Sequence, residues 1–364
     1  MVVVRPSWIE VDLGAIADNV RAIGEAVAPA RVCAVVKADG YGHGDVPVAE
    51  TALEAGADRL AVALVGEGIR LREAGIDAPI LLLSEPVERD ADDVVAWRLT
   101  PSVYRASFLE AVADAAPPGY PVHVVADTGM HRVGAPPVSA AGLCREVVDR
   151  GLRLEGIWTH FAVAEEDPEF TRLQLQRLMD LVAELDDPPE TVHASNTAGG
   201  LGFPEARIDM VRAGIGIYGL RPTPGFAEGV PLRPAMRVVS RVSYVQHHEA
   251  GTRPSYGRVR PLPDAATVAT VPIGYADGVS RRLGDTGGGV LVRGRRYPFA
   301  GRVTMDQIMV DLGDDPVEVG DEVVLLGRQG DEEISADEWA ERLGTINYEI
   351  VCGFGPRLPR RYVS

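Results

Sequence analysis

The sequence predicts an α/β fold in which an N-terminal parallel (β/α)8 barrel is followed by a mainly β C-terminal domain. Three observations predict it. The chain has 364 residues, more than one compact unit usually contains. Short apolar segments rich in β-branched residues alternate with helical segments eight times over residues 31–219. After this stretch the pattern changes to strands that follow one another without long helices between them.

The first half supplies the elements of a barrel in order. A leading amphipathic helix is predicted over Leu13 to Val27, where apolar residues recur at helical spacing. Later segments such as DVPVAETALEAG, EGIRLREAG and FTRLQLQRLMDLVAEL are also helical in pattern and often end at Gly. Eight alternating strands and helices predict a parallel sheet that closes on itself. The strands are predicted at RVCAVVK, LAVAL, PILLLS, LTPSV, VHVVAD, LEGIWTHF, TVHASN and IDMVRAGI.

The second domain follows RPTPGFAEGVPLRP, a stretch rich in Pro and Gly. We therefore predict a first domain over residues 1–230 and a second over residues 231–364. Strands are predicted at RVVSRVSYV, TVATVPIG, GVLVRG, QIMVDL and DEVVLLG. SADEWAERLG predicts a helix, because a Ser cap and an acidic first turn open it, and INYEIVC predicts a further strand.

The composition restricts the classes of function. A net charge of -17 disfavours nucleic-acid partners, which need clustered Lys and Arg on the protein. No apolar run is long enough to cross a bilayer and no secretory signal is visible, so we expect a cytoplasmic protein without a membrane partner. Cys33, Cys144 and Cys352 are far apart, which predicts core positions rather than a disulfide framework or a metal site.

Lys37 ends the first barrel strand in the string AVVKADGYGHG. Barrel enzymes carry their chemistry at the carboxyl ends of the strands, and a partly desolvated lysine amine is suited to Schiff-base formation with an aldehyde cofactor. The structural alternative is a strand-end lysine that extends to solvent. Gly40, Gly42 and Gly44 favour the cofactor interpretation, because they let the backbone bend around a bound group.

The same string resembles the pyridoxal-phosphate attachment motif of the bacterial alanine racemase family. The similarity extends over essentially the whole chain. It implies an isomerase that interconverts L- and D-alanine and so supplies D-alanine for peptidoglycan precursors. The other motifs similar to those of the family, in the family's order, are SWIEVDL, DTGMHRVG, THFA, HASNTAGG, MVRAGIGIYGL, VSYV, IGYADGVSRRL, GRVTMDQ and INYEIVC.

The resemblance implies a two-base mechanism on a pyridoxal 5'-phosphate external aldimine. Lys37 would hold the cofactor and act as one base, and Tyr275 would be the other, since inversion of a stereocentre needs a proton-transfer group on each face. Arg212 would face the pyridine nitrogen and keep it unprotonated, because a guanidinium does not readily give up a proton. His160 would bridge Arg212 and Tyr275. Taken alone, Tyr275 and His160 would be interpreted as a half-buried aromatic and a core histidine.

The resemblance also implies sites for substrate and cofactor. The substrate carboxylate would meet Arg132 and the backbone N–H of Met305, with Asp306 supporting the loop. Tyr275 and Met305 lie in the second domain, so the resemblance implies a homodimer in which each second domain completes its neighbour's site. No metal is expected. The implied cofactor-binding residues are Lys37, Tyr41, Leu83, His160, Asn196, Thr197, Arg212, Gly214 and Ile215.

Three positions depart from the family pattern. Val125 stands where many members have a carbamylated lysine that pairs with the carboxylate-binding arginine, so an anion, a water or a rearranged contact must replace it. His131 stands where Gly is usual. Pro356 replaces a pocket tyrosine and makes room for a side chain larger than methyl.

These departures leave alternatives open. One is a broader-specificity or serine racemase of the same family. Another is a pyridoxal-phosphate decarboxylase of the same architecture, although those enzymes usually have an acidic residue where Arg212 stands. The third is a pyridoxal-phosphate carrier protein, a class that lacks a second domain with IGYADG.

Overall fold

The computed structural model describes residues 5–364. Two compact units make up this part of the chain: residues 15–233 form the barrel unit, and residues 5–14 with 234–364 form the β unit. The predicted boundary near residue 230 lies close to this division. The predicted first domain differs at its start, because β1 (Ser7–Asp12) pairs with β10 (Met236–Arg241) and β18 (Arg360–Val363) and so belongs to the β unit.

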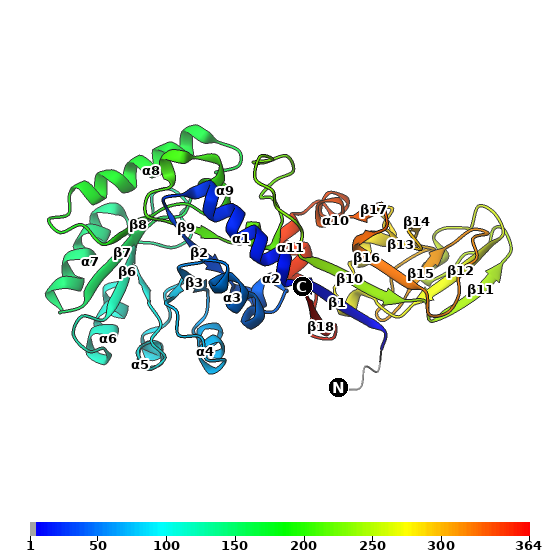
Figure 1. Cartoon of the computed structure of the whole chain (residues 1–364), viewed down its shortest axis with the longest axis horizontal. Coiled ribbons are helices and arrows are strands. Elements are labelled where there is room, and N and C mark those ends of the chain that lie inside the picture. Colours follow the sequence, from blue (N-terminus) through cyan, green and yellow to red (C-terminus); the bar gives the residue numbers. More distant parts are fainter. Residues whose placement is uncertain (1–4) are drawn as a thin grey trace. The chain divides into compact units, whose positions relative to one another are not determined.

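Eight parallel strands in residues 15–233 form the centre of the barrel unit, as predicted (Figure 1). They make two four-stranded sheets, in the orders β4-β3-β2-β9 and β5-β6-β7-β8. The N–H of Leu82 donates to the carbonyl of Thr100 at 2.9 Å, and that of Arg212 to the carbonyl of Ser195 at 3.0 Å, which joins the sheets at both edges. The strands are β2 (Arg31–Val35), β3 (Arg59–Val62), β4 (Ile80–Leu82), β5 (Ser102–Val103), β6 (Pro121–Val125), β7 (Arg153–Trp158), β8 (Thr191–His193) and β9 (Met210–Ala213).

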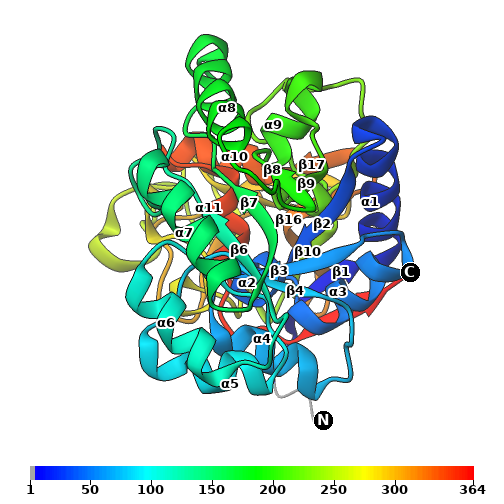
Figure 2. The same cartoon turned by 90° about the vertical axis from the view of Figure 1, so that its left-hand side faces the viewer.

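Helices surround these strands (Figures 1 and 2). The leading helix α1 (Leu13–Val27) has the predicted bounds, and its apolar side is buried at Ile16, Val20, Ile23 and Val27. The spacing of these four positions places them on one face of a helix. The other helices are α2 (Lys37–Tyr41), α3 (Asp45–Glu54), α4 (Val65–Glu73), α5 (Ala91–Ala96), α6 (Ala106–Ala115), α7 (Pro137–Asp149), α8 (Pro168–Ala183) and α9 (Thr197–Gly202), with 3-10 turns η1 (Glu88–Asp90), η2 (Pro204–Ala206) and η3 (Ile215–Tyr218).

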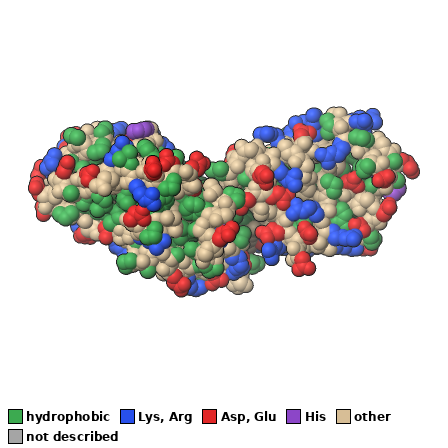
Figure 3. Space-filling view, turned by 90° about the horizontal axis from the view of Figure 1, so that it is seen from above, with side chains coloured by type: hydrophobic (Ala, Val, Ile, Leu, Met, Phe, Trp, Pro, Cys, Tyr) green, Lys and Arg blue, Asp and Glu red, His purple; other side chains and the backbone are tan. Residues whose placement is uncertain are grey.

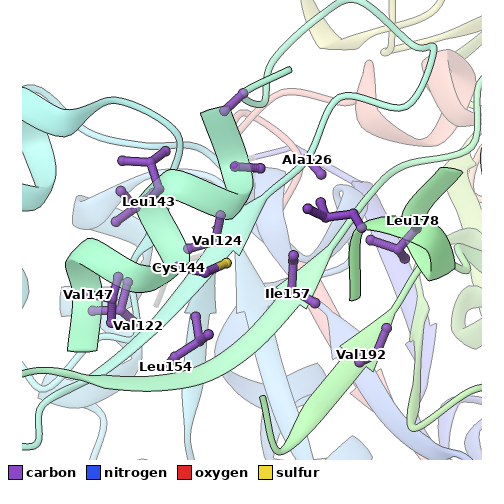
Figure 4. Packing of buried hydrophobic residues seen from close by; sticks show 14 of the residues in the cluster. Val122, Val124, Ala126, Leu143, Cys144, Val147, Leu154, Ile157, Leu178 and Val192 are labelled. Atoms are coloured by element: carbon purple, nitrogen blue, oxygen red, sulfur yellow. The ribbon is translucent and has the colours of Figure 1, made fainter. Parts of the chain in front are cut away.

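Figure 4 shows the part of the barrel core in which α7 packs on β6 and β7. Val124 and Ile157 are fully buried on the two strands, and Cys144 of α7 lies between apolar neighbours. Leu178 of α8 and Val192 of β8 continue the same cluster. Burial of apolar side chains on this scale is the main favourable contribution to folding and holds the strand ends in place.

The β unit contains two sheets. The larger has the order β14-β13-β16-β10-β1-β18 with β17 paired to β16, and the smaller has the order β11-β12-β15. The Ser335 side chain accepts a hydrogen bond from the N–H of Glu338 at 3.0 Å, which confirms the predicted cap of α10. The remaining elements are β11 (Tyr244–His248), β12 (Ala266–Val271), β13 (Gly289–Val292), β14 (Arg295–Pro298), β15 (Ile308–Asp311), β16 (Glu322–Gln329), β17 (Glu332–Ile334), α10 (Ala336–Leu343) and α11 (Asn347–Cys352), with 3-10 turns η4 (Tyr256–Arg258), η5 (Tyr275–Asp277) and η6 (Arg281–Gly284).

Two predictions for the chain are wrong. INYEIVC forms helix α11 instead of a strand, and its buried residues Asn347, Ile350 and Val351 have helical spacing rather than the alternation of a half-buried strand. The assignment of all three cysteines to the core fails at Cys352, which is exposed at the end of this helix, whereas Cys33 and Cys144 are buried.

The surface carries charge of both signs. On the face shown in Figure 3, acidic and basic side chains are intermixed over both units. Between residues 5 and 364, none of the helices combines the length and apolar character that crossing a bilayer would require.

Candidate active site

Lys37 lies at the carboxyl end of β2, at the start of a left-handed turn. The backbone φ angles of residues 38–41 are between 51° and 57°. Non-glycine residues in this region are strained by about 1–3 kcal/mol each and persist only where their surroundings hold them. One such contact is a hydrogen bond of 2.7 Å from the N–H of Ala38 to Oε1 of Glu67. The turn thus fixes the backbone that follows Lys37.

A cluster of polar groups lies where α9 and η3 begin. Oγ1 of Thr197 accepts hydrogen bonds from the N–H groups of Gly214 at 3.1 Å and Gly216 at 3.4 Å. The phenol oxygen of Tyr41 is close by, since a Cβ added to Gly214 would lie 2.7 Å from it. A phenol, a hydroxyl and the backbone N–H groups of a turn are suitable ligands for a phosphate.

Arg212 is buried in the barrel, and both terminal nitrogens of its guanidinium, Nη1 and Nη2, have hydrogen-bond partners. Nη1 lies 2.7 Å from Nδ1 of His193, and Nη2 donates to the carbonyls of Thr159 and Ala194 at 2.9 Å each. The guanidinium carbon stands 4.5 Å from the ring centre of Trp158, within range of a cation–π interaction. Burial lowers the pKa of Arg212 to about 10, which still leaves it charged at neutral pH.

His160 stands among three cationic side chains. Its Nδ1 lies 3.3 Å from Nη2 of Arg212. The pKa of His160 is held well below its ordinary value, because burial disfavours the imidazolium and because Arg212, Arg132 and Lys37 place positive charge near it. The barrel unit therefore brings together four residues that the sequence analysis proposed from separate motifs, and His160 is a neutral imidazole there.

Arg132 is exposed on the loop after β6, beside a small cavity next to Val125. The cavity has a volume of about 10 Å³, room for about one water molecule, and its walls include Arg132, His160 and Asp127. The described residues give Arg132 neither an ion pair nor a hydrogen bond. The space left by the family's lysine is thus open, and the guanidinium of Arg132 remains available to an anionic ligand.

The loop around Arg132 is held through Asp127. Its carboxylate accepts hydrogen bonds from the N–H groups of Gly129 and His131, both at 3.0 Å, and Oδ2 lies 2.9 Å from Nδ1 of His131. His131, which departs from the family pattern, therefore makes a polar contact to its own loop. Its φ of 56° is in the left-handed region that glycine adopts readily, which explains why Gly is suited to this position.

Three further predicted cofactor residues occupy strand or helix ends. Leu83 follows β4 and is half-buried, with its N–H bonded to the carbonyl of Val62 at 2.8 Å. Asn196 caps α9, since its side chain accepts from the N–H of Gly199 at 2.8 Å. Ile215 is buried in η3 beside Gly214. All three follow the carboxyl end of a barrel strand: Leu83 follows β4, Asn196 follows β8 and Ile215 follows β9.

The β unit holds a second group of predicted residues on two adjoining loops. The N–H of Tyr275 donates to the carbonyl of Thr304, and that of Ala276 to the carbonyl of Met305, both at 3.0 Å. Tyr275 is 42% exposed and Met305 is 53% exposed, so both side chains project from the unit. Pro356, at the third departure from the family pattern, is also exposed in this unit, and Asp306 pairs with Arg357 at 2.7 Å.

Sequence reasoning missed several residues that position these groups. Asp277 is fully buried, pairs with Arg5 at 2.5 Å and accepts from the N–H of Gly274 at 2.9 Å, which fixes the turn of Tyr275. Glu67 supports the turn after Lys37, and His193 contacts Arg212 directly. Asp277 and His193 lie inside quoted motifs, IGYADG and HASN, which was the available signal. Glu67 carries none.

Comparison with known proteins identifies the family. Residues 11–222 match the model of the alanine racemase N-terminal domain, and residues 235–362 match that of the alanine racemase C-terminal domain. The chain belongs to the alanine racemase family. Every predicted site residue lies within one of the two matched ranges.

Relatives in the alanine racemase family agree over nearly full length. The chain is 47% identical to the alanine racemase of Symbiobacterium thermophilum, over 98% of this chain and 97% of the relative. The crystal structure of alanine racemase from E. faecalis superposes with a TM-score of 0.94 at 38% identity, covering 99% of this chain and 98% of that one. A histidine racemase from Leuconostoc mesenteroides has a TM-score of 0.92 at 29% identity, covering 100% and 99%. The protein is therefore an amino-acid racemase of the alanine racemase fold.

Proposed function

We propose that this racemase interconverts L- and D-alanine, that pyridoxal phosphate is its cofactor, and that Lys37 and Tyr275 are its two bases. The observation that carries the proposal is the grouping of Lys37, Arg132 and Arg212 around the neutral imidazole of His160 in the barrel unit. Family membership supports the same reaction.

The residues of the barrel unit fit pyridoxal phosphate. The phosphate would be held by the phenol of Tyr41, the hydroxyl of Thr197 and the N–H groups of Gly214 and Ile215, a set without a cationic side chain. The N–H of Gly214 would exchange its acceptor here, Oγ1 of Thr197, for the phosphate. In residues 5–364, Nη1 and Nη2 of Arg212 are engaged while Nε has no hydrogen-bond partner, so its N–H suits an unprotonated ring nitrogen. When bound, the cofactor joins the substrate amine and acidifies the α-hydrogen.

Lys37 and Tyr275 then carry out the proton transfers. We assign to Tyr275 the removal of the α-proton of L-alanine, while the ammonium of Lys37 delivers a proton to the opposite face, and the roles reverse for D-alanine. Arg212 keeps a positive charge that would lie beside the ring nitrogen of the bound cofactor, would keep that nitrogen unprotonated and would so limit side reactions such as transamination.

Arg132 and the backbone N–H of Met305 would hold the substrate carboxylate. Arg132 suits this role because it is exposed, flanks a cavity and has no acidic partner among the described residues. Because Tyr275 and Met305 project from the β unit, we propose a homodimer in which this unit completes the site of a second copy. A monomer would then be inactive.

A broader substrate range is the main alternative. It is favoured by the smaller residue at Pro356 and by the name of one structural relative, a histidine racemase. The decarboxylase alternative is disfavoured because Arg212, and not an acid, would face the ring nitrogen. The carrier alternative is disfavoured because the chain matches both domains of a racemase.

One experiment tests the proposal. The purified protein is incubated separately with L-alanine, L-serine, L-lysine and L-arginine, D-amino-acid formation is measured by chiral chromatography, and the visible spectrum is recorded. We expect cofactor absorbance and fastest conversion of alanine. Lys37→Ala should abolish both signals, whereas Lys37→Ala with undiminished racemisation would remove Lys37 from the mechanism. Faster conversion of another amino acid would replace alanine as the substrate.

A further inference from the structure

A chain of buried polar side chains runs from Arg212 across the interior of the barrel unit to Glu155. Nη1 of Arg212 lies 2.7 Å from Nδ1 of His193, and Nε2 of His193 lies 3.0 Å from Nδ1 of His123. Nε2 of His123 lies 2.9 Å from Oε2 of Glu155, which also accepts from Nη1 of Arg59 at 2.9 Å. Each contact joins side chains on a different pair of strands, so this hydrogen-bond chain forms only when the barrel is folded.

The donor at one end fixes the direction of every bond. A guanidinium only donates, so Nδ1 of His193 must accept from Arg212 and carries no hydrogen. The hydrogen of His193 is then on Nε2 and is donated to Nδ1 of His123. His123 in turn carries its hydrogen on Nε2 and donates it to the carboxylate of Glu155. Both imidazoles are therefore neutral and in a single tautomer.

If the hydrogen bonds ran in the opposite direction, from Arg59 towards Arg212, two donors would face each other at Arg212. Nη1 of Arg59 lies 3.4 Å from Nε2 of His123 and could donate to it only if His123 carried its hydrogen on Nδ1. His193 would then carry its hydrogen on Nδ1, opposite the donor Arg212 at 2.7 Å. Burial, with the nearby Arg59 and Arg212, lowers the pKa values of His123 and His193, which is consistent with neutral rings.

Neighbouring residues pack closely around the hydrogen-bonded side chains and hold them in place. A Cβ added to Gly156 would lie 2.4 Å from the ring of His123, so only glycine leaves room for this imidazole. The ring of Trp158 stacks on His193 at a centroid distance of 5.7 Å and lies beneath the guanidinium of Arg212. Ser102 fixes the indole by accepting from its Nε1 at 3.1 Å.

The buried charge of Arg212 needs a counter-charge, and no carboxylate in the described part of the chain pairs with it directly. Glu155 is the acid at the end of its hydrogen-bond chain. We propose that Glu155 is a positioning residue that acts through His123 and His193 to fix the orientation of the Arg212 guanidinium. This inference rests on the proposed function, in which Arg212 serves the ring nitrogen of the cofactor.

The first test observes the wild-type histidines directly. The full-length protein is labelled with 15N-histidine, and the ring nitrogens of the 7 histidines are measured by NMR, with assignment by single substitutions. We expect His193 and His123 to be neutral and protonated on Nε2. A hydrogen on Nδ1 of His193, or a doubly protonated ring, would show that the hydrogen bonds do not run from Arg212 to Glu155 as inferred. This measurement does not depend on racemase activity, so it remains decisive if the proposed function fails.

The second test removes the charge of Glu155, which also pairs directly with Arg59 at 2.9 Å and Arg153 at 3.2 Å. Glu155→Gln should shift the ring 15N signals of His123 and His193, because a neutral amide accepts more weakly than a carboxylate, and should lower kcat by about 10-fold to 100-fold, the effect of a small misplacement of a catalytic group, with KM changed less than about threefold. His123→Phe, which breaks the chain in the middle, should reproduce the loss of kcat. Glu10→Gln is the control, because Glu10 pairs with Arg237 at 2.7 Å in the β unit. Wild-type kcat with an unchanged His193 signal in Glu155→Gln would refute the inference.

Discussion

Oγ1 of Thr197, the first residue of α9, accepts a hydrogen bond of 3.1 Å from the N–H of Gly214, at the start of η3. The two residues are brought together by the carboxyl ends of neighbouring strands, β8 and β9. This contact orders the backbone N–H groups that we assign to the phosphate of the cofactor. The phenol of Tyr41 leaves no space for a side chain at Gly214.

Gly214→Ala should therefore weaken cofactor binding. The added Cβ would lie 2.7 Å from the phenol oxygen of Tyr41, so Tyr41 or the loop must move. We expect the dissociation constant of pyridoxal phosphate to rise by at least about tenfold, the equivalent of ~1.4 kcal/mol. Titration of the apoprotein followed by absorbance measures it. Gly142→Ala on α7 is the control, since a Cβ there meets nothing within 4 Å. Equal affinities of the two variants would show that Gly214 does not line the phosphate site.

Tyr275→Phe should remove one proton transfer and leave the other. In residues 5–364 the hydroxyl of Tyr275 has no hydrogen-bond partner, so its loss should not destabilise the β unit. We expect kcat to fall by about 10²-fold to 10⁴-fold, the usual contribution of a general base. In deuterium oxide, exchange of the α-hydrogen of D-alanine should continue through Lys37, while that of L-alanine should fall.

The control for this prediction is Tyr244→Phe, which removes a hydroxyl from a tyrosine that is 55% exposed on β11. It should keep wild-type activity. If Tyr275→Phe lost exchange of both enantiomers equally, the assignment of the two bases to opposite faces would be wrong.

Asp127 should make substrate binding depend on pH. Burial by itself would raise the pKa of Asp127, but hydrogen bonds from the N–H groups of His131 and Gly129 and from the His131 ring outweigh it and hold the pKa below its ordinary value. A carboxyl group with a depressed pKa stabilises its loop above the ordinary pKa of about 4 and loses that contribution as pH falls through the lower, folded value. KM should therefore be constant near neutral pH and rise only in acid.

Asp127→Ala should raise KM by about tenfold at neutral pH with a smaller change in kcat, because two charge-assisted hydrogen bonds to the loop of Arg132 are lost. His131→Ala is the matched variant. It removes only the contact of a ring whose side chain is 79% exposed, and should change KM by less than about threefold. A larger rise of KM in His131→Ala would mean that substrate binding depends on the contact of Asp127 with the His131 imidazole rather than on its contacts with the loop backbone.

Site residues could be predicted from the sequence where they lie in short motifs, and could not where they lie singly inside strands. Lys37, Thr197, Arg212 and Gly214 lie in compact motifs at strand ends, where glycine and polar residues interrupt an apolar pattern. Glu155 and His123 sit inside strands β7 and β6, and nothing in their local sequence marks them as partners. Their contact depends on the closure of the barrel, which places side chains from separate strands in one interior layer.

The strand predictions succeeded in the barrel unit because its strands are buried on both sides and so form continuous apolar runs. The failure at α11 has the same origin, since a short apolar segment such as INYEIVC suits a strand or a buried helix equally. The spacing of Asn347, Ile350 and Val351 identifies the helix only once their burial is known.

Leu178→Ala should show how strongly the outer helices hold the barrel. Leu178 lies on α8, is fully buried, and packs in the cluster that includes Ile157 and Val192. Truncation of a buried leucine leaves a cavity and costs about 2–5 kcal/mol. Leu173→Ala is the control on the same helix, since Leu173 is 44% exposed and its loss should cost no more than about 0.5 kcal/mol. Urea unfolding followed by circular dichroism measures both. Equal midpoints would mean that α8 contributes little to the stability of the barrel unit, in which case its apolar face must serve another contact.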